Sequence, residues 1–541
     1  MQAKILKIAT ALLCLAASAN AQDMRIGVKY NDGLTHPQIG TTAQSEDGAI
    51  KLRLIGKKQN FGGTADTRDT DIDSPKSVHI TPDGTKYYVN SLEGCATIAY
   101  DFKTNNKLKV IKYDLEETRD AALWGEESGL YKWRREHDHK NTFMGKPVES
   151  TFSHHGRYLW VPFYRRTFDT NAQEPSALAV IDTRTDEIVR MMETGPLPKM
   201  IRTSPDGKTI AVSHWGNNTI GLIDISSSDP MAWRHKKVLV VDKELELNFP
   251  EGVQVDRDNS SGYCLRGTVF SPDGQFLFVG CMGGGGGIAV VNTQTGEYLG
   301  RILGMMNNVR HIVISNGWLY LSINAGGYVQ RIRLSKFLET ARAMQASGSK
   351  TIRLDGWESC KVGTGARTIS ISPDGRYIFA ACNNVSTLDV VDTKTFTTVC
   401  NIDVDSYSVG LDISGDGRYV LVTSQGRKAG SGWAGGNAVN IYEVEYRHPP
   451  VQTYCANCGA ERHEGDSKCS ACGVEFTDTY AMTEENADSD ETVLNSGTGL
   501  LAETNDGIFN KKNLIYAGGA VGGLLLLGGL YKIFPVIYGL K

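Results

Sequence analysis

The sequence lacks an excess of charge of either sign. Lys and Arg total 57 and Asp and Glu total 61 among 541 residues, so the formal net charge is −4. A protein that binds nucleic acid through its bulk surface carries a clear basic excess, so this class is not indicated. The chain is also longer than one hydrophobic core usually organises, unless the fold is a repeat.

Several motifs that would indicate a particular chemistry are missing. No Lys-Ser/Thr pair follows the glycine run at 283–287, which excludes a phosphate-binding P-loop and favours a flexible hairpin loop. No G-x-S-x-G nucleophile elbow with a plausible partner order is present. Neither Cys-x-x-Cys pair is followed by His, which excludes haem attachment of the C-x-x-C-H kind. The sequence therefore contains no complete catalytic set.

Glycine is abundant, at 59 residues, and many copies belong to a repeated turn. An apolar run, Ser-Pro-Asp-Gly or a relative of it, and a second apolar run recur seven times. Pro presets φ, Asp bonds its own backbone and Gly takes positive φ, so each copy predicts a hairpin turn. A third strand, a T-x-T turn and a fourth strand follow. This pattern predicts an all-β, seven-bladed β-propeller over residues 42–447. The turns begin at Thr81, Ser153, Ser204, Ser271, Ser315, Ser372 and Ser414.

The two ends of the repeat predict how the ring closes. The last unit has three strands and stops at His448-Pro449-Pro450. The segment 49–57, AIKLRLIGK, precedes the first unit and has the alternation of a strand. We expect it to complete the seventh blade, which removes an exposed sheet edge.

The repeat resembles that of a known family. The apolar run, SPDG, apolar run and V-I-D-T-x-T, as in AVIDTRTDEIV at 179–189, are similar to the YVTN/YncE-like seven-bladed propellers over residues 49–446. That family includes surface proteins, binding modules and some enzymes, so the resemblance implies the fold and leaves the function open. Blades one and two depart most, because SHHG replaces SPDG and a charged insertion separates them.

Residues 1–21 have the features of a secretory signal peptide. Lys4 and Lys7 precede an apolar stretch at 8–17, and Ala-Asn-Ala at 19–21 fits a cleavage site. Cys14 raises the alternative of a lipoprotein, but Leu13 stands where such signals carry a small residue. Export would place the propeller on the extracytoplasmic, periplasmic side of the cell envelope.

A transmembrane helix is predicted at 513–534. Its centre, 514–531, holds eighteen residues without a charge, which just reaches the length that spans a bilayer. Gly518-x-x-x-Gly522 and Gly519-x-x-x-Gly523 place small residues on one face, which permits self-association of the helix. The alternative is that the membrane helix merely tolerates these glycines, and the sequence fits both interpretations equally well. The chain is thus expected to be a single-pass membrane protein, in a membrane that the sequence does not identify.

A cysteine module separates the propeller from this helix. Cys455-x-x-Cys458 and Cys469-x-x-Cys472, each followed by Gly, predict a structural zinc ribbon at 452–476. Exported cysteines tend to oxidise, so two disulfides are the alternative. The next segment, 477–512, is predicted to be a disordered acidic stalk, because 473–510 holds nine acidic and no basic residues.

The repeat also predicts a ligand site on one face. The innermost strand of each blade ends at its turn, so the strand starts share the opposite face, here called the top face. Five residues before each turn start, five of the seven positions are basic, and they would ring the mouth of the central channel. Such a ring attracts carboxylates or phosphates, unless each cation pairs with a neighbouring carboxylate. The positions are Lys76, Val148, Lys199, Arg266, Arg310, Arg367 and Val409, and His214 and Trp215 lie on the same face.

Two functions remain open at this point. The first is a non-enzymatic recognition or scaffold module that binds a protein partner or an anionic ligand through its top face. The alternative is a metal-assisted lyase or lactonase-like hydrolase, with His214, His311 and the 137–139 loop as candidates. That loop lies in the insertion 115–147, which is expected to form a small cap.

Overall fold

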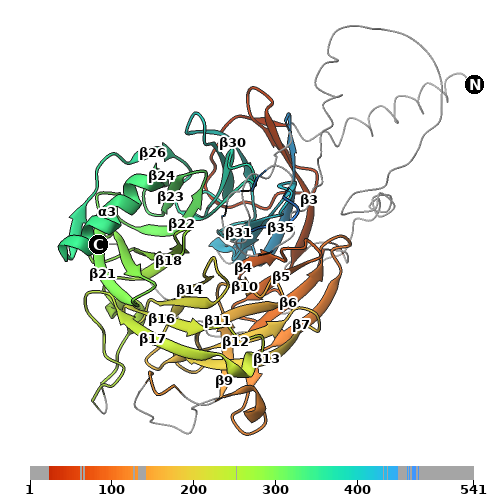
Figure 1. The fold of residues 1–541 in the computed structure, drawn as a ribbon. Helices are drawn as coiled ribbons and strands as arrows, with labels where there is room; N and C mark the ends of the chain where they lie inside the picture. Colours follow the sequence, from red (N-terminus) through yellow and green to blue (C-terminus); the bar gives the residue numbers. More distant parts are fainter. Residues whose placement is uncertain are drawn as a thin grey trace, which may run out of the picture.

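A computed structural model describes residues 24–448, except 61–63, 65–66, 126–127, 132–141, 251–252, 430–431 and 435, together with 460, 462–463, 466–470 and 473. Seven sheets are arranged in a ring around a common centre (Figure 1), and their strands pair antiparallel except for one parallel pair in each of two sheets. The predicted all-β, seven-bladed propeller is thereby confirmed. The predicted signal peptide, stalk and transmembrane helix, and most of the predicted ribbon, lie outside the described residues. Within the described part, no helix is long and apolar enough to cross a membrane.

Each blade has at least four strands, and its first strand lies innermost. Blade one comprises β4 (Pro75–Ile80), β5 (Lys86–Ser91), β6 (Ala96–Asp101) and β7 (Lys107–Lys112). Blade two comprises β10 (Thr151–Ser153), β11 (Tyr158–Arg166), β12 (Ser176–Asp182) and β13 (Glu187–Thr194), with β8 (Asp114–Leu115) and β9 (Phe143–Pro147) added. Blade three comprises β14 (Pro198–Thr203), β15 (Thr209–His214), β16 (Thr219–Asp224) and β17 (Arg234–Val240). Blade four comprises β18 (Leu265–Phe270), β19 (Phe276–Cys281), β20 (Ile288–Asn292), β21 (Glu297–Leu303) and β25 (Thr351–Arg353).

The remaining blades follow the same plan. Blade five comprises β22 (Val309–Ser315), β23 (Trp318–Ile323), β24 (Tyr328–Arg333) and β26 (Glu358–Lys361). Blade six comprises β27 (Ala366–Ile371), β28 (Tyr377–Cys382), β29 (Thr387–Asp392) and β30 (Thr397–Asp403). Blade seven comprises β31 (Ser408–Ile413), β32 (Tyr419–Ser424), β35 (Ala438–Tyr446), β3 (Ile50–Gln59), β2 (Thr42–Gln44) and β1 (Arg25–Ile26). The other elements are η1 (Ala121–Leu123), η2 (Pro230–Ala232), α2 (Arg257–Ser260), α3 (Leu334–Ser347) and the hairpin β33 (Arg427–Ala429) and β34 (Gly432–Ala434).

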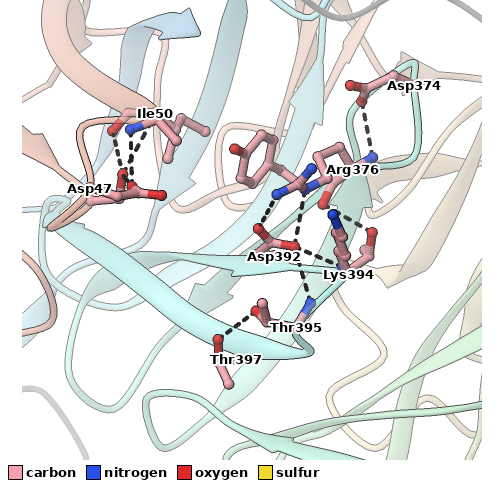
Figure 2. Close-up of polar contacts among 12 residues, drawn as sticks. Asp47, Ile50, Asp374, Arg376, Asp392, Lys394, Thr395 and Thr397 are labelled. Atoms are coloured by element: carbon pink, nitrogen blue, oxygen red, sulfur yellow. Dashed lines mark hydrogen bonds and ion pairs between the residues drawn. The ribbon is translucent and has the colours of Figure 1, made fainter. Parts of the chain in front are cut away.

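The repeated turn holds together as its residue types predict. In blade six, Ser372 Oγ donates to Asp374 Oδ1 at 2.5 Å, and the same carboxylate oxygen accepts from Arg376 N at 3.0 Å. Figure 2 shows the Arg376 side chain reaching Asp392, whose Oδ2 lies 2.6 Å from Nη2. Asp392 Oδ1 in turn accepts from Lys394 N at 2.7 Å, which closes the T-x-T turn. One arginine therefore links the two turns of the blade.

The serine of this turn gives a direct test of its contribution. In blade four, Ser271 is buried, donates from Oγ to Asp273 Oδ1 and accepts from Phe276 N at 2.9 Å. Ser271→Ala leaves a buried amide and a carboxylate without this partner, so we expect a loss of about 1–2 kcal/mol in the free energy of unfolding. Chemical denaturation monitored by circular dichroism measures it. The exposed Gln275→Ala in the same turn is the control, and an equal effect of both changes would contradict this role.

The ring closes through the N-terminal strand. β3 pairs antiparallel with β35, from Ile50 opposite Tyr446 to Gln59 opposite Ala438. The prediction that 49–57 completes the seventh blade is confirmed. Leu52 and Leu54 of β3 are fully buried in the core of this blade, beside Val444.

Two buried carboxylates fix the segment that precedes β3 to blades six and seven. Tyr30 Oη donates to Asp389 Oδ2 at 2.7 Å. Asp405 Oδ2 lies 2.8 Å from Lys57 Nζ, and its Oδ1 lies 2.6 Å from His36 Nδ1. Burial raises the pKa of Asp405, but the contacts with His36 and Lys57 outweigh burial and hold that pKa below its usual value. The segment is thus part of the folded propeller.

Candidate anion site in the central channel

The channel wall consists of the seven innermost strands, β4, β10, β14, β18, β22, β27 and β31. They follow one another around the centre of the molecule (Figure 1). Blades one and two are joined directly, because Ser77 Oγ donates to the carbonyl of Val148 at 2.7 Å. Each strand runs from the top face to its SPDG-type turn, so equal positions in the repeat lie at equal depth in the channel.

The five basic positions of the repeat come together in this channel. Burial lowers the pKa of Lys76 well below its usual value, and the charges of Arg367, Arg266, Arg310 and Lys199 lower it further. Burial and the neighbouring Arg367 lower the pKa of Arg266 to about 10. The pKa of Arg310 is lowered by the same causes, burial first and then Arg266 and Arg367. The five side chains therefore form a cationic ring, and the charges of its members lower the pKa values of Lys76, Lys199, Arg266 and Arg310.

The two other positions of this ring are apolar. Val148 and Val409 are buried, at 0% and 2% exposure. Both belong to the sector where blades seven, one and two meet. The positive charge is therefore concentrated on blades three to six, with Lys76 of blade one opposite them.

Only one cation of the ring has a carboxylate partner within 4.0 Å in the described chain. Lys199 Nζ lies 3.8 Å from Asp258 Oδ1 and 3.7 Å from the centre of the Tyr164 ring. Arg310 contacts Met282 Sδ at 3.6 Å, and its Nε has no hydrogen-bond partner among the described residues. Arg367 lies over the Tyr407 ring at 5.8 Å. Local neutralisation of each cation, the alternative reading of the sequence, thus applies to Lys199 alone.

Glu149 is an acidic group on which the charges of the ring act. Burial raises the pKa of this carboxyl, while the charges of Arg266, Lys76 and Arg367 act in the opposite direction. Glu149 and Asp258 together cannot neutralise five cations, so the top half of the channel keeps a positive potential. A concave site with this potential attracts an anion and strengthens each charge-assisted hydrogen bond to it.

No family model matches this chain. A similar curated protein is Antigen Lp49 of Leptospira interrogans, which is 24% identical over 265 residues, 46% of this chain and 50% of that protein. The chain thus aligns with about half the length of this relative.

Two solved structures are similar in fold. One is the hydrazine synthase of Kuenenia stuttgartiensis, with 14% identity and a TM-score of 0.45 over 67% of this chain and 95% of that chain. The other is the β-propeller domain of Cps50 (Swd1) from Myceliophteria thermophila, with 12% identity and a TM-score of 0.47 over 69% of this chain and 97% of that chain. At these values the likeness says nothing about function.

The two further top-face candidates differ in their positions. Trp215 borders the ring: its indole lies 5.0 Å from Lys199 Nζ, and its Nε1 donates to the carbonyl of Asp258 at 3.0 Å. His214 is fully buried. Its Nε2 lies 2.7 Å from Thr194 Oγ1 and its Nδ1 lies 2.8 Å from Thr219 Oγ1, so neither ring nitrogen is left for a ligand.

The metal candidates of the sequence fall mostly beyond the described chain. The 137–139 loop and Cys455, Cys458 and Cys472 lie outside it, and Cys469 is buried. Among the described residues, no group of three His, Cys, Asp or Glu side chains is arranged to hold a metal. The run 283–287 is a loop between β19 and β20, and the four glycines from Gly284 to Gly287 have positive φ.

Reasoning from the sequence missed a second group of channel residues. His79, Arg202 and Asp412 stand two positions before the turn starts of their blades, and line a cavity with Glu149 and His311. Five positions before the turn, a basic residue recurs in most blades, and this recurrence is visible in the sequence. Two positions before it, the residue types differ from blade to blade, so only their shared place in the repeat could have indicated that they meet.

Proposed function

We propose that this chain is a recognition module that binds an anionic ligand at the top-face mouth of its propeller channel. The observation that supports this is the cationic ring of five side chains, four of which lack an ion-pair partner in the described chain. Burying like charges together costs folding free energy, which a bound anion would offset. Carboxylate or phosphate groups, on a small molecule or on a protein partner, have the required chemistry.

The proposed setting of this module is the cell envelope. A signal peptide at 1–21 would export the chain, and a helix at 513–534 would anchor it, with the propeller on the extracytoplasmic side. A zinc ribbon at 452–476 and the acidic stalk would space the propeller from the membrane. Metal analysis of the purified full chain should find one zinc, reduced by Cys455→Ser; a metal-free chain would favour the disulfide alternative.

A pull-down from cell-envelope extracts tests the proposed function. The full chain in detergent is compared with a variant carrying Arg266→Glu, Arg310→Glu and Arg367→Glu, and with Arg53→Glu as an exposed control. We expect the three changes to abolish retention of the anionic partner, because attraction becomes repulsion at the channel mouth. A milder variant with Gln at the same positions serves if the charge-reversed chain does not fold. Retention of every partner by both variants would contradict the proposal.

A further inference from the structure

A second ring of residues faces the channel nearer to the turns. It lies three residues after the cationic ring, and all of its members except Thr151 line a cavity of about 280 Å³. The cavity reaches the turn prolines Pro205, Pro272 and Pro373, so it belongs to the turn-face half of the channel. None of the five basic side chains of the cationic ring lines it. The members are His79, Thr151, Arg202, Val269, Val313, Ser370 and Asp412.

Arg202 is the common neighbour of the polar groups in this cavity. Its guanidinium makes no hydrogen bond or ion pair within the described chain. Its charge nevertheless acts on the pKa of four other groups, which places all four within electrostatic reach of it. These groups are Glu149, Asp412, His79 and His311.

The two histidines offer N–H donors to the cavity. His79 Nε2 accepts a hydrogen bond from Ser150 N at 3.1 Å, and His311 Nδ1 accepts one from Ile369 N at 3.4 Å. Burial lowers the pKa of both rings to about 3, so both are neutral near pH 7. A neutral imidazole that accepts at one nitrogen carries its proton on the other. The protons are therefore on His79 Nδ1 and His311 Nε2, which have no partner in the described chain.

Two carboxylates supply acceptors in the same cavity. Asp412 accepts from Ile80 N and from Ile413 N, each at 2.9 Å, and both oxygens keep a further lone pair. Burial raises the pKa of Asp412 to about 6, so it is mostly ionised at neutral pH. Glu149 has no hydrogen bond within the described residues. The cavity thus combines hydrogen-bond donors, supplied by Arg202 and the two histidines, with two carboxyl groups that act as acceptors.

We propose that this cavity binds a small zwitterion with the size and charge pattern of a free amino acid. The ligand carboxylate would bind to Arg202 and the two imidazole N–H groups, and the ligand ammonium to Asp412 and Glu149. A plain anion would leave the carboxylates unpaired, a plain cation would leave Arg202 unpaired, and either costs desolvation free energy. The volume lies just below the roughly 300 Å³ at which drug-sized pockets begin, so the ligand is small. The lining of this site contains none of the five cations of the top-face ring, but the two sites are electrostatically linked, because the charges of Arg266, Lys76 and Arg367 act on Glu149.

Titration calorimetry of the purified full chain with the twenty free amino acids tests this site. We expect at least one to bind, and its two single-charge analogues, the amine without the carboxylate and the acid without the amine, to bind at least tenfold more weakly. A site built for a polar group rejects the analogue that lacks it. Absence of binding by all twenty, or equal binding of the analogues, would overturn the proposal.

Substitutions locate the binding within the channel. Arg202→Gln and Asp412→Asn should each weaken amino-acid binding at least tenfold, whereas the control Lys208→Gln, at an exposed position outside the channel, should leave it unchanged. Binding that survives both cavity substitutions would overturn the assignment. If Arg202→Gln does not fold, the test rests on two measurements: amino-acid binding by Asp412→Asn, and binding of the single-charge analogues by the unsubstituted chain. Binding of pyrophosphate at the top face should persist in Asp412→Asn, so the two proposals fail separately.

Discussion

A chain in which Leu52 is replaced by aspartate is expected to lose its cooperative fold at room temperature. Leu52 lies in β3, is fully buried, and packs in the same core as Val444 of β35. Removing a buried leucine side chain costs about 3–5 kcal/mol, and burying an unpaired carboxylate adds to this. The sum approaches the whole stability of a typical domain, about 5–15 kcal/mol. Thermal unfolding followed by circular dichroism measures the effect.

The neighbouring residue provides the matched control. Arg53 points away from the core, where its Nη2 lies 2.5 Å from Glu443 Oε2 on β35. An exposed ion pair is worth at most about 1 kcal/mol, so Arg53→Gln should melt close to the unsubstituted chain. Equal melting of Leu52→Asp and Arg53→Gln would show that β3 does not close the ring.

Lys76→Met is expected to stabilise the chain by about 1–4 kcal/mol at pH 7, in the absence of a bound anion. The lysine is half-buried beside other cations of the ring, and methionine fills a similar volume without a charge. The exposed Lys208→Met is the control and should change stability little. Denaturant unfolding of the three chains measures the difference, and a less stable Lys76→Met chain would contradict the account.

The pH dependence gives this prediction a second readout. The pKa of Lys76 in the folded chain lies well below 10.5, so the unfolded chain binds more protons between that pKa and 10.5. Stability contributed by this group therefore rises with pH across that window. Lys76→Met should lack this part of the rise. An unchanged pH slope in the variant would show that Lys76 keeps an ordinary pKa.

The repeat explains why the fold and the cationic ring could be predicted. Each SPDG-type turn fixes where its strand ends, so counting back from the turn places Arg266, Arg310 and Arg367 at one depth. The position of His214 at the end of the second strand of blade three placed it on the top face, but could not show that hydroxyls of Thr194 and Thr219 occupy its ring nitrogens. Such contacts depend on how neighbouring strands and blades pack.

The N-terminal segment illustrates a second limit of the sequence. The alternation in 49–57 predicted β3, because half of its side chains face a core. Nothing in 24–44 predicted its contacts, since single polar residues such as Tyr30 and His36 bind carboxylates on β29 and after β30. Isolated polar contacts between distant parts of the chain leave no periodic pattern.

Calorimetric titration of inorganic pyrophosphate into the purified full chain at low salt tests the central claim most directly. The account predicts that one pyrophosphate binds per chain. Its affinity should fall at least about 100-fold, or 2.7 kcal/mol, when Arg266, Arg310 and Arg367 are all replaced by Gln. The substituted chain should melt no lower than the original, because like charges have been removed. Absence of binding by the unsubstituted chain, or equal affinity in the substituted one, would contradict the assignment of the channel mouth as an anion site.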